Sequence, residues 1–251
     1  MNRKEHKNKV SIILPNFNSS EFILSTINSV KNQSYKNWNL IIVDDCSDNK
    51  TKKILKKFEN YKKIKIIWLK KNRGAAYCRN LAIKKSKSKY LAFLDSDDMW
   101  EKNKLKFQIN HMDKNNFNFT YTYYKTFGLK SKKVKPPEKF DFNNFTKNTS
   151  IATSSMILKR NIVGDAKFTD TIICEDYFFK CKILKKVKYA YCIKNYLTKY
   201  RIRQDSMQSS MFKNFFWIWK INQKYNKFNF FQNLNSLFFI SVNSLQKYGF
   251  K

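Results

Sequence analysis

The stretch YLAFLDSDDMW, from Tyr90 to Trp100, decides how the rest of the chain can be organised. Its first half, YLAFL, is a short apolar run typical of a buried strand. Asp95, Asp97 and Asp98 follow directly, although the 251 residues include only 18 Asp and Glu against 51 Lys and Arg. Such a concentration of scarce acids indicates a ligand site at the strand's end. The alternative is a solvated acidic turn, whose acids favour the dipole of a following helix.

Similar apolar runs precede this stretch at 10–15 (VSIILP), 39–45 (NLIIVDD) and 64–69 (IKIIWL). Between and after them, apolar residues recur at helical spacing, which predicts helices at 23–30, 54–61, 75–82 and 102–113. Asn18, with Glu21 three residues later, is a helix-start signature. Strands that alternate with helices predict an α/β fold: a mostly parallel sheet covered by helices, Rossmann-like in its N-terminal half.

The second half is less regular. Residues 117–127 and 196–203 are expected to be extended, 154–158 a strand and 175–184 a helix. The Lys-rich stretch 128–148, with Pro136-Pro137, is expected to be a loop or flap. We predict one domain over residues 1–210, with a nucleotide-binding half at about 8–115 and an acceptor half at about 116–210. Residues 211–251 form a helical appendage.

The composition of the chain excludes several classes of protein and several kinds of site. Hydrophobic residues make up 42% of the chain, which excludes disorder. The cysteine number, five, is odd, no CxxC pair is present, and there are only two histidines, so neither a zinc site nor a Ser-His-Asp triad is expected. No signal peptide or membrane-spanning run of about 18 apolar residues is evident, which predicts a cytoplasmic protein. The net charge of +33 fits either an anionic partner or a codon bias.

Polar clusters follow three of the predicted strands. They are Asn16 and Asn18 after the first, Asp44 and Asp45 after the second, and Asp95, Asp97 and Asp98 after the fourth. The carboxyl ends of parallel strands share one edge, where such sheets bind ligands. Carboxylates there suit Mg²⁺ or Mn²⁺, which can neutralise a diphosphate. Arg73, Gly74 and Arg79 could add contacts to phosphate. The chain has no GxGxxG and no P-loop, which argues against NAD and P-loop chemistry.

Five motifs, in order, resemble glycosyltransferase family 2 on the GT-A fold: VSIILPNFN, IIVDDCSDN, NRGAAYCRN, FLDSDD and EDYFFK. The similarity covers about residues 10–209. ATSSMILKR and LTKYRIRQDSMQSS resemble the branch that includes teichuronic-acid and other surface-polysaccharide transferases. The resemblance implies an inverting transferase that moves a sugar from a nucleoside diphosphate, classically UDP, to a hydroxyl of a glycan or lipid-linked acceptor.

The resemblance also implies roles for single residues. Asp45 falls where the family binds the nucleotide base, Asp97 where it contacts ribose or metal, and Asp98 where it ligates Mn²⁺ or Mg²⁺, with Asp95 opening the motif. Asp176 falls at the general base, with Glu175 beside it. The remaining predicted donor-binding residues are Pro15, Asn16, Asn18, Arg73, Gly74, Arg79, Arg201 and Arg203. Many relatives have a metal-binding His where this chain has Arg203, so we expect Arg201 and Arg203 to clamp the diphosphate.

Two other functions compete with this one. The charge and the interleaved aromatics would suit a nucleic-acid-binding protein, but the acids would repel phosphate, so no nucleic-acid partner is expected. The second alternative is a catalytically inactive scaffold with a GT-A-like fold.

The tail after residue 210 is basic and aromatic. Phe212, Phe216 and Trp219 share one helix face. That face either packs on the domain or holds the protein, as a peripheral protein, on an anionic membrane at its cytoplasmic side.

Overall fold

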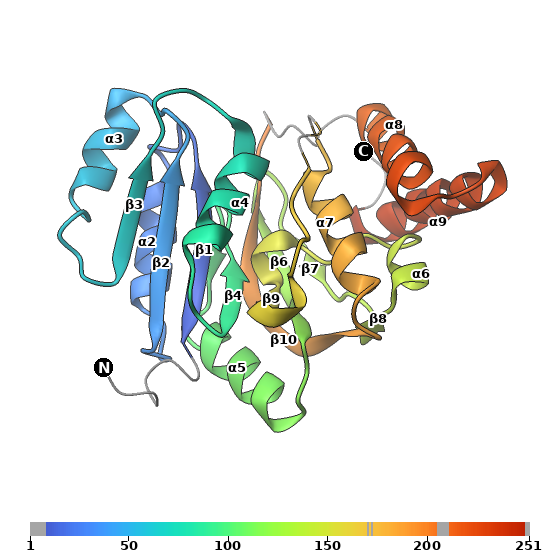
Figure 1. The fold of residues 1–251 in the computed structure, drawn as a ribbon, viewed down its shortest axis with the longest axis horizontal. Helices are drawn as coiled ribbons and strands as arrows, with labels where there is room; N and C mark the ends of the chain where they lie inside the picture. Colours follow the sequence, from blue (N-terminus) through green and yellow to red (C-terminus); the bar gives the residue numbers. More distant parts are fainter. Residues whose placement is uncertain (1–8, 170, 172, 205–210, 249–251) are drawn as a thin grey trace.

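The computed structural model describes residues 9–169, 171, 173–204 and 211–248. Its centre is a mixed sheet with the strand order β3-β2-β1-β4-β9-β6-β10-β5 (Figure 1). The strands on this path are β1 (Val10–Asn16), β2 (Trp38–Asp44), β3 (Ile64–Trp68), β4 (Tyr90–Phe93), β5 (Met99–Trp100), β6 (Phe119–Gly128), β9 (Ile157–Lys159) and β10 (Ala190–Ile202). The first four pair in parallel, as do β6 and β10, while β9 joins β4 and β6 antiparallel.

Both faces of the sheet are buried, because alternate residues of each parallel strand enter different cores. Ile13 of β1 belongs to one core, and its neighbours Ile12 and Leu14 belong to the other. Helices α4 (Gly74–Lys85) and α7 (Glu175–Leu184) cover the first face. Helices α2 (Ile23–Lys31), α3 (Asn49–Lys56) and α5 (Lys104–Lys114) cover the second. This double cover explains why the strands read as continuous apolar runs.

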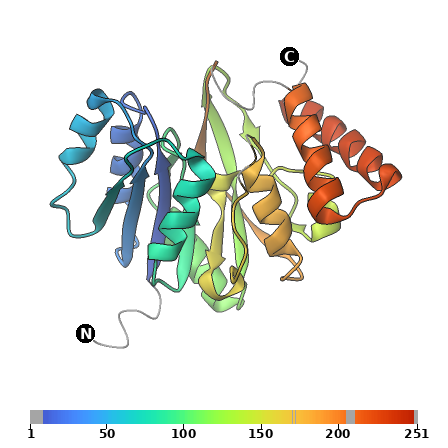
Figure 2. The same ribbon diagram turned by 45° about the horizontal axis from the view of Figure 1, so that its top comes forward.

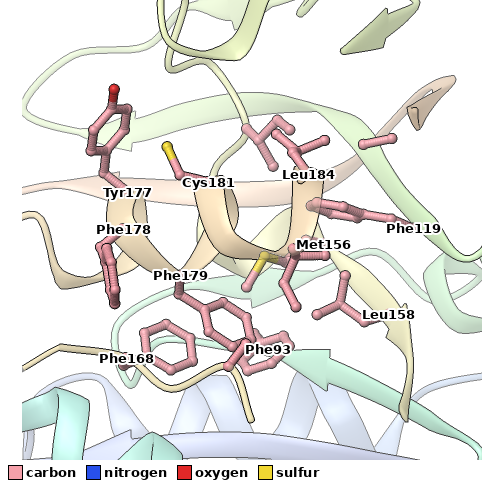
Figure 3. Close-up of a cluster of buried hydrophobic side chains, with 14 of the residues drawn as sticks. Phe93, Phe119, Met156, Leu158, Phe168, Tyr177, Phe178, Phe179, Cys181 and Leu184 are labelled. Carbon is pink, nitrogen blue, oxygen red and sulfur yellow. The ribbon is translucent and has the colours of Figure 1, made fainter. Parts of the chain in front are cut away.

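Helix α7 is held by aromatic packing. Figure 3 shows Phe179 pointing from α7 toward Phe168 and Phe93. The rings of Phe168 and Phe179 stack with centroids 4.0 Å apart, and Phe93 lies 5.7 and 5.9 Å from them. This cluster joins α7 to β4, the strand that leads into Asp95.

Several local predictions were wrong in whole or in part; the helix predicted at 54–61, for example, lies at Asn49–Lys56. Residues 128–148 are not a plain loop: they contain β7 (Lys133–Val134), β8 (Lys139–Phe140) and α6 (Phe142–Phe145). These elements have two to four residues each, too few to show a period. Asn18 does not start α2; its φ of 44° is left-handed, and α2 begins at Ile23. The strand predicted at 154–158 is split into a 3₁₀ turn, η1 (Thr153–Ser155), followed by β9.

The tail forms a helical hairpin at the end of the molecule opposite β3 (Figures 1 and 2). It consists of α8 (Met211–Ile221), a π-helical turn (Asn222–Asn226) and α9 (Phe230–Tyr248). Within the described residues, no helix is both long and apolar enough to cross a membrane. The boundary predicted near residue 210 lies outside the described residues.

Candidate active site

The ends of β1 and β2 are locked together by side chains. Pro15 and Asn16 pair in register with Val43 and Asp44. The Asn16 side chain donates to an Asp44 carboxylate oxygen at 2.7 Å and to the Ser47 hydroxyl at 3.2 Å. Asn16 and Asp44 are 2% and 0% exposed, so they hold the edge of the sheet in shape.

The backbone of Asn18 also reaches Ser47, to whose hydroxyl it donates at 3.0 Å. Its side-chain oxygen accepts from the backbone N–H of Asp48 at 2.8 Å, at the N-cap of α3. The left-handed turn at Asn18 therefore ties the loop after β1 to the loop after β2.

Asp45 ties the end of β2 to the start of α4. One carboxylate oxygen accepts from the backbone N–H of Arg73 at 2.7 Å and the other from Gly74 at 2.8 Å. Gly74 has a φ of +82°, a conformation that side chains other than glycine's disfavour. The Arg73 guanidinium lies over the Tyr77 ring, 4.1 Å from its centroid. The predicted trio Asp45, Arg73 and Gly74 is therefore adjacent in space.

Arg79 joins the turn after β4 to the start of α7. Its guanidinium contacts Asp95 and Glu175, each at 2.7 Å, and its side chain is only 7% exposed. Burial would lower the pKa of Arg79, but the two carboxylates outweigh burial and raise it. Arg79 remains cationic and fixes the start of α7 beside the acidic turn. Because its charge is already matched, it acts as a bridge between two predicted site residues.

The acids of the turn after β4 differ sharply from one another. Asp98 is 1% exposed, and its carboxylate accepts from the Ser154 hydroxyl at 2.5 Å and from the backbone N–H of Arg201 at 2.8 Å. Asp97 keeps 16% exposure and pairs with Arg203 at 3.0 Å. Burial raises the pKa of both acids, and neighbouring carboxylates raise it further. Asp98 therefore fastens the turn to β10 and η1, while Asp97 and Asp95, at 16% and 27% exposure, remain partly accessible.

The expected group of three open carboxylates is not formed. In the part of the chain that the structure describes, no three His, Cys, Asp or Glu side chains come together in a way that could hold a metal ion. The physical reason is that Arg79 pairs with Asp95, and that Ser154 and a backbone N–H already bond Asp98. Mg²⁺, however, usually takes one or two carboxylates and completes its shell with phosphate oxygens and water. The partly exposed Asp97 fits that smaller requirement.

Asp176, in the first turn of α7, is held on one side only. Its Oδ2 accepts from Lys180 at 2.7 Å and from the Thr153 hydroxyl at 2.8 Å. Burial would raise the pKa of Asp176, but the Lys180 cation and these hydrogen bonds outweigh burial and lower it to about 2. The side chain is 19% exposed, so an ionised carboxylate remains accessible. Neighbouring Glu175 is turned to Arg79, and burial raises its pKa.

Three of these partners are not among the residues predicted from the sequence. Lys180 stands four residues after Asp176, on the same helix face, so its spacing was a usable signal. Thr153 and Ser154 carried no such signal, because their hydroxyls reach Asp176 and Asp98 across 23 and 56 residues of sequence.

The amino-acid sequence is similar to those of known proteins. Residues 11–178 match the family model described as glycosyl transferase family 2. TuaG of Bacillus subtilis, whose name assigns it to teichuronic acid biosynthesis, is 32% identical over 226 residues, covering 88% of this chain and 90% of TuaG. WfgD of Escherichia coli, named as a UDP-Glc:alpha-D-GlcNAc-diphosphoundecaprenol beta-1,3-glucosyltransferase, is 36% identical over 207 residues, or 81% of each chain.

Solved structures agree on the fold. Residues 1–349 of S. aureus TarS, crystallised with UDP-GlcNAc, superpose with a TM-score of 0.75 at 21% identity, covering 94% of this chain and 75% of that one. A mannosyltransferase from Pyrobaculum calidifontis, in complex with GDP-Man and Mn²⁺, gives a TM-score of 0.71 at 13% identity, covering 94% and 73%. The predicted GT-A fold is confirmed. The family model matches residues 11–178, from the first predicted strand to the start of α7, which is more than half of the chain, so this chain belongs to glycosyl transferase family 2.

Proposed function

We propose that the chain transfers a sugar from a nucleoside diphosphate sugar, a UDP-sugar, to a hydroxyl of a glycan or lipid-linked acceptor, with inversion. The observation that carries this proposal is the carboxylate of Asp176. One of its oxygens is held by Lys180 and Thr153, and the side chain is ionised and partly exposed. The names of the relatives support the donor and acceptor classes.

Asp176 acts as the general base. As the acceptor hydroxyl attacks the anomeric carbon, Asp176 takes its proton, and the bond from that carbon to the diphosphate oxygen breaks on the opposite face. A single displacement of this kind inverts the configuration. Lys180 and Thr153 hold the carboxylate in place, which avoids a loss of orientation in the transition state.

Arg201 and Arg203 hold the leaving diphosphate. The Arg201 guanidinium is stacked on Phe22 and Phe127, 4.5 and 4.2 Å from the ring centroids, and its Nε donates to the backbone oxygen of Asp97 at 2.9 Å. A guanidinium fixed in this way loses little side-chain freedom when it binds phosphate. Asp45, next to Arg73 and Gly74, receives the nucleotide base.

Mn²⁺ or Mg²⁺ is the cofactor of this proposal. Asp97 would hold the ion, which supplies positive charge to the leaving diphosphate when bound. Asp98 and Asp95 keep the turn that carries Asp97 in position. A peripheral place on the cytoplasmic face of a membrane would bring a lipid-linked acceptor within reach.

The test is a thermal-shift panel of nucleotide sugars with and without Mn²⁺, followed by mass spectrometry of hydrolysis products. We expect one nucleoside diphosphate class to raise the melting temperature more in the presence of Mn²⁺, and its sugar to be released slowly. If RNA stabilises the protein and no nucleotide sugar does, the chain is a nucleic-acid-binding protein. If nucleotide sugars bind without any turnover, it is an inactive scaffold.

A further inference from the structure

Helix α9 turns polar residues toward the protein and aromatic residues toward solvent, the reverse of the usual arrangement of an amphipathic helix. Asn233, Ser236 and Ile240 face the protein, at 1%, 1% and 6% exposure. Phe231 and Phe238 are 78% and 62% exposed. At about 100° per residue, these two sets lie on nearly opposite faces of the helix. Two polar side chains are thus buried while two phenyl rings meet solvent.

The buried face is specifically bonded, so this orientation is built into the fold. The Ser236 hydroxyl donates to the backbone oxygen of Thr146 at 2.6 Å and accepts from the Asn222 amide at 3.1 Å. The Tyr177 hydroxyl of α7 donates to the other end of Asn222 at 2.7 Å. Rotating α9 to hide its rings would break these buried bonds.

Helix α8 continues the exposed apolar surface. Phe212 and Phe216 are 83% and 53% exposed. Rings connect the two helices, with Trp219 5.6 Å from Phe230 and Phe230 5.8 Å from Phe231. We call this surface the aromatic face; its members are Phe212, Phe216, Phe230, Phe231, Leu234 and Phe238. Exposed apolar surface of this extent marks an interaction site.

The charge around the aromatic face selects its partner. Residues 211–251 contain six Lys and no Asp or Glu. Lys220 lies beside the rings, 4.2 Å from the centroid of Phe216. A second copy of the chain would bring a further set of lysines against the first, and like charges repel. An anionic lipid surface offers both a boundary for the rings and phosphate for the lysines.

We propose that the aromatic face docks on an anionic bilayer, with its rings at the headgroup boundary and the hairpin lying in the plane of the surface. The hairpin is seated on α7 through Asn222 and Tyr177, and the Cys174 thiol at the N-cap of α7 contacts Asn214 of α8 at 3.7 Å. Docking therefore brings the helix that carries Asp176 to the membrane. That last consequence rests on the proposed function, because it gives a lipid-linked acceptor its route to the base.

The experiment is co-sedimentation of the full chain with vesicles of phosphatidylglycerol or of phosphatidylcholine alone, at low and high salt. We expect binding to the anionic vesicles that weakens with salt. Phe231→Ser/Phe238→Ser should lower that binding by about tenfold or more, because two rings leave the headgroup boundary. The matched control is Tyr61→Ser/Phe107→Ser, which removes two rings of 44% and 45% exposure elsewhere on the surface and should bind like wild type.

Hydrolysis of the nucleotide sugar, measured in the same samples without vesicles, separates this proposal from the proposed function. Both double variants should retain wild-type hydrolysis and melting temperature. The docking proposal is overturned if wild type ignores anionic vesicles at low salt, or if the Phe231→Ser/Phe238→Ser protein binds like the control. It is also overturned if the wild type is a dimer in solution that this variant converts to monomer. Vesicle binding without any hydrolysis by wild type would instead overturn the proposed function and leave the docking standing.

Discussion

The acids of the site do different work because their environments differ. The carboxylate oxygens of Asp45 and Asp98 accept hydrogen bonds from backbone N–H and hydroxyl groups. Asp95 and Glu175 neutralise Arg79. Asp97 and Asp176 are 16% and 19% exposed beside a cation, and Asp95, although paired with Arg79, is 27% exposed. Chemistry at this edge is therefore expected from Asp97 and Asp176, with Asp95 as the further carboxylate that solvent reaches and the buried acids providing the frame.

Replacing Asp176 by Asn removes the carboxylate that accepts the proton but keeps a side chain of nearly the same shape. We expect the rate of transfer to fall by roughly 10²-fold or more, the usual effect of losing a general base. Binding of the donor, measured by calorimetry, should not change. Near wild-type transfer by Asp176→Asn would move the role of base to Glu175.

Removing the cation next to Asp176 should shift the pH dependence of transfer. In the wild type the pKa of Asp176 is lowered to about 2, so the base is ionised at mildly acidic and neutral pH. Lys180→Met removes the largest of the effects that oppose burial and leaves only the Thr153 hydrogen bond and the Arg79 charge against it, so that pKa rises. Because the base must be deprotonated, the acidic limb of the kcat profile should move to higher pH.

The matched control for Lys180→Met is Lys182→Met. Lys182 is 40% exposed; its amine lies 3.6 Å from Asp165 and 5.7 Å from the centroid of the Phe178 ring, away from Asp176, so its replacement should leave the kcat profile unchanged. An identical acidic limb in Lys180→Met and wild type would show that this ion pair does not set the state of the base.

At the scale of elements, the turn between β4 and β5 is held by β10, η1 and α2 as well as by its own backbone hydrogen bond from Asp98 to Asp95. The Asp98 carboxylate accepts hydrogen bonds from the Ser154 hydroxyl of η1 and from the backbone N–H of Arg201 in β10. Arg201 in turn donates to the backbone oxygen of Asp97. The position of Asp97 thus depends on β10, a strand about a hundred residues further along the chain.

Substitution of the neighbours Asp97 and Asp98 should therefore affect different properties: stability for Asp98 and the response to Mn²⁺ for Asp97. Asp98→Ala leaves two buried donors without an acceptor, which should lower the free energy of unfolding by about 2 kcal/mol or more. Asp97→Ala loses one partly exposed ion pair, worth less than about 1 kcal/mol, but should lose the Mn²⁺-dependent stabilisation by nucleoside diphosphate. Urea unfolding and thermal shift on the same two proteins measure both effects.

The reverse pattern would contradict this division of labour. An Asp98→Ala protein with wild-type stability and no response to Mn²⁺ would restore Asp98 as the metal ligand.

At the scale of the whole molecule, the C-terminal hairpin is both part of the core and a surface of its own. Ile218, Ile221 and Ile240 are buried in the same cluster as α7. The tail was expected either to pack on the domain or to lie on a membrane. It packs through one face, which leaves the opposite face of α9 exposed (Figure 2).

Two substitutions in the hairpin separate its faces. Ile221 is 1% exposed, so Ile221→Ala should lower the free energy of unfolding by about 2–5 kcal/mol, the usual cost of such a cavity. Phe231→Ala, at a side chain that is 78% exposed, should change it by less than about 0.5 kcal/mol. Urea denaturation of both proteins gives the comparison. Equal effects would mean that the hairpin does not fold against the domain as a unit.

The sequence by itself determined the alternation of strands and helices, the common edge of Asn16, Asp45 and Asp97, and the family. These follow from local signals, because apolar runs, periodicity and motif order are carried by neighbouring residues. The tertiary structure alone decided which carboxylates are open, since the partners of Asp98 and Asp176 come from distant segments. It also decided that α9 buries Asn233 and Ser236 and exposes Phe231 and Phe238. An amphipathic pattern predicts that apolar residues face a protein core, and only long-range hydrogen bonds, here to Thr146 and through Asn222 to Tyr177, can fix the opposite orientation.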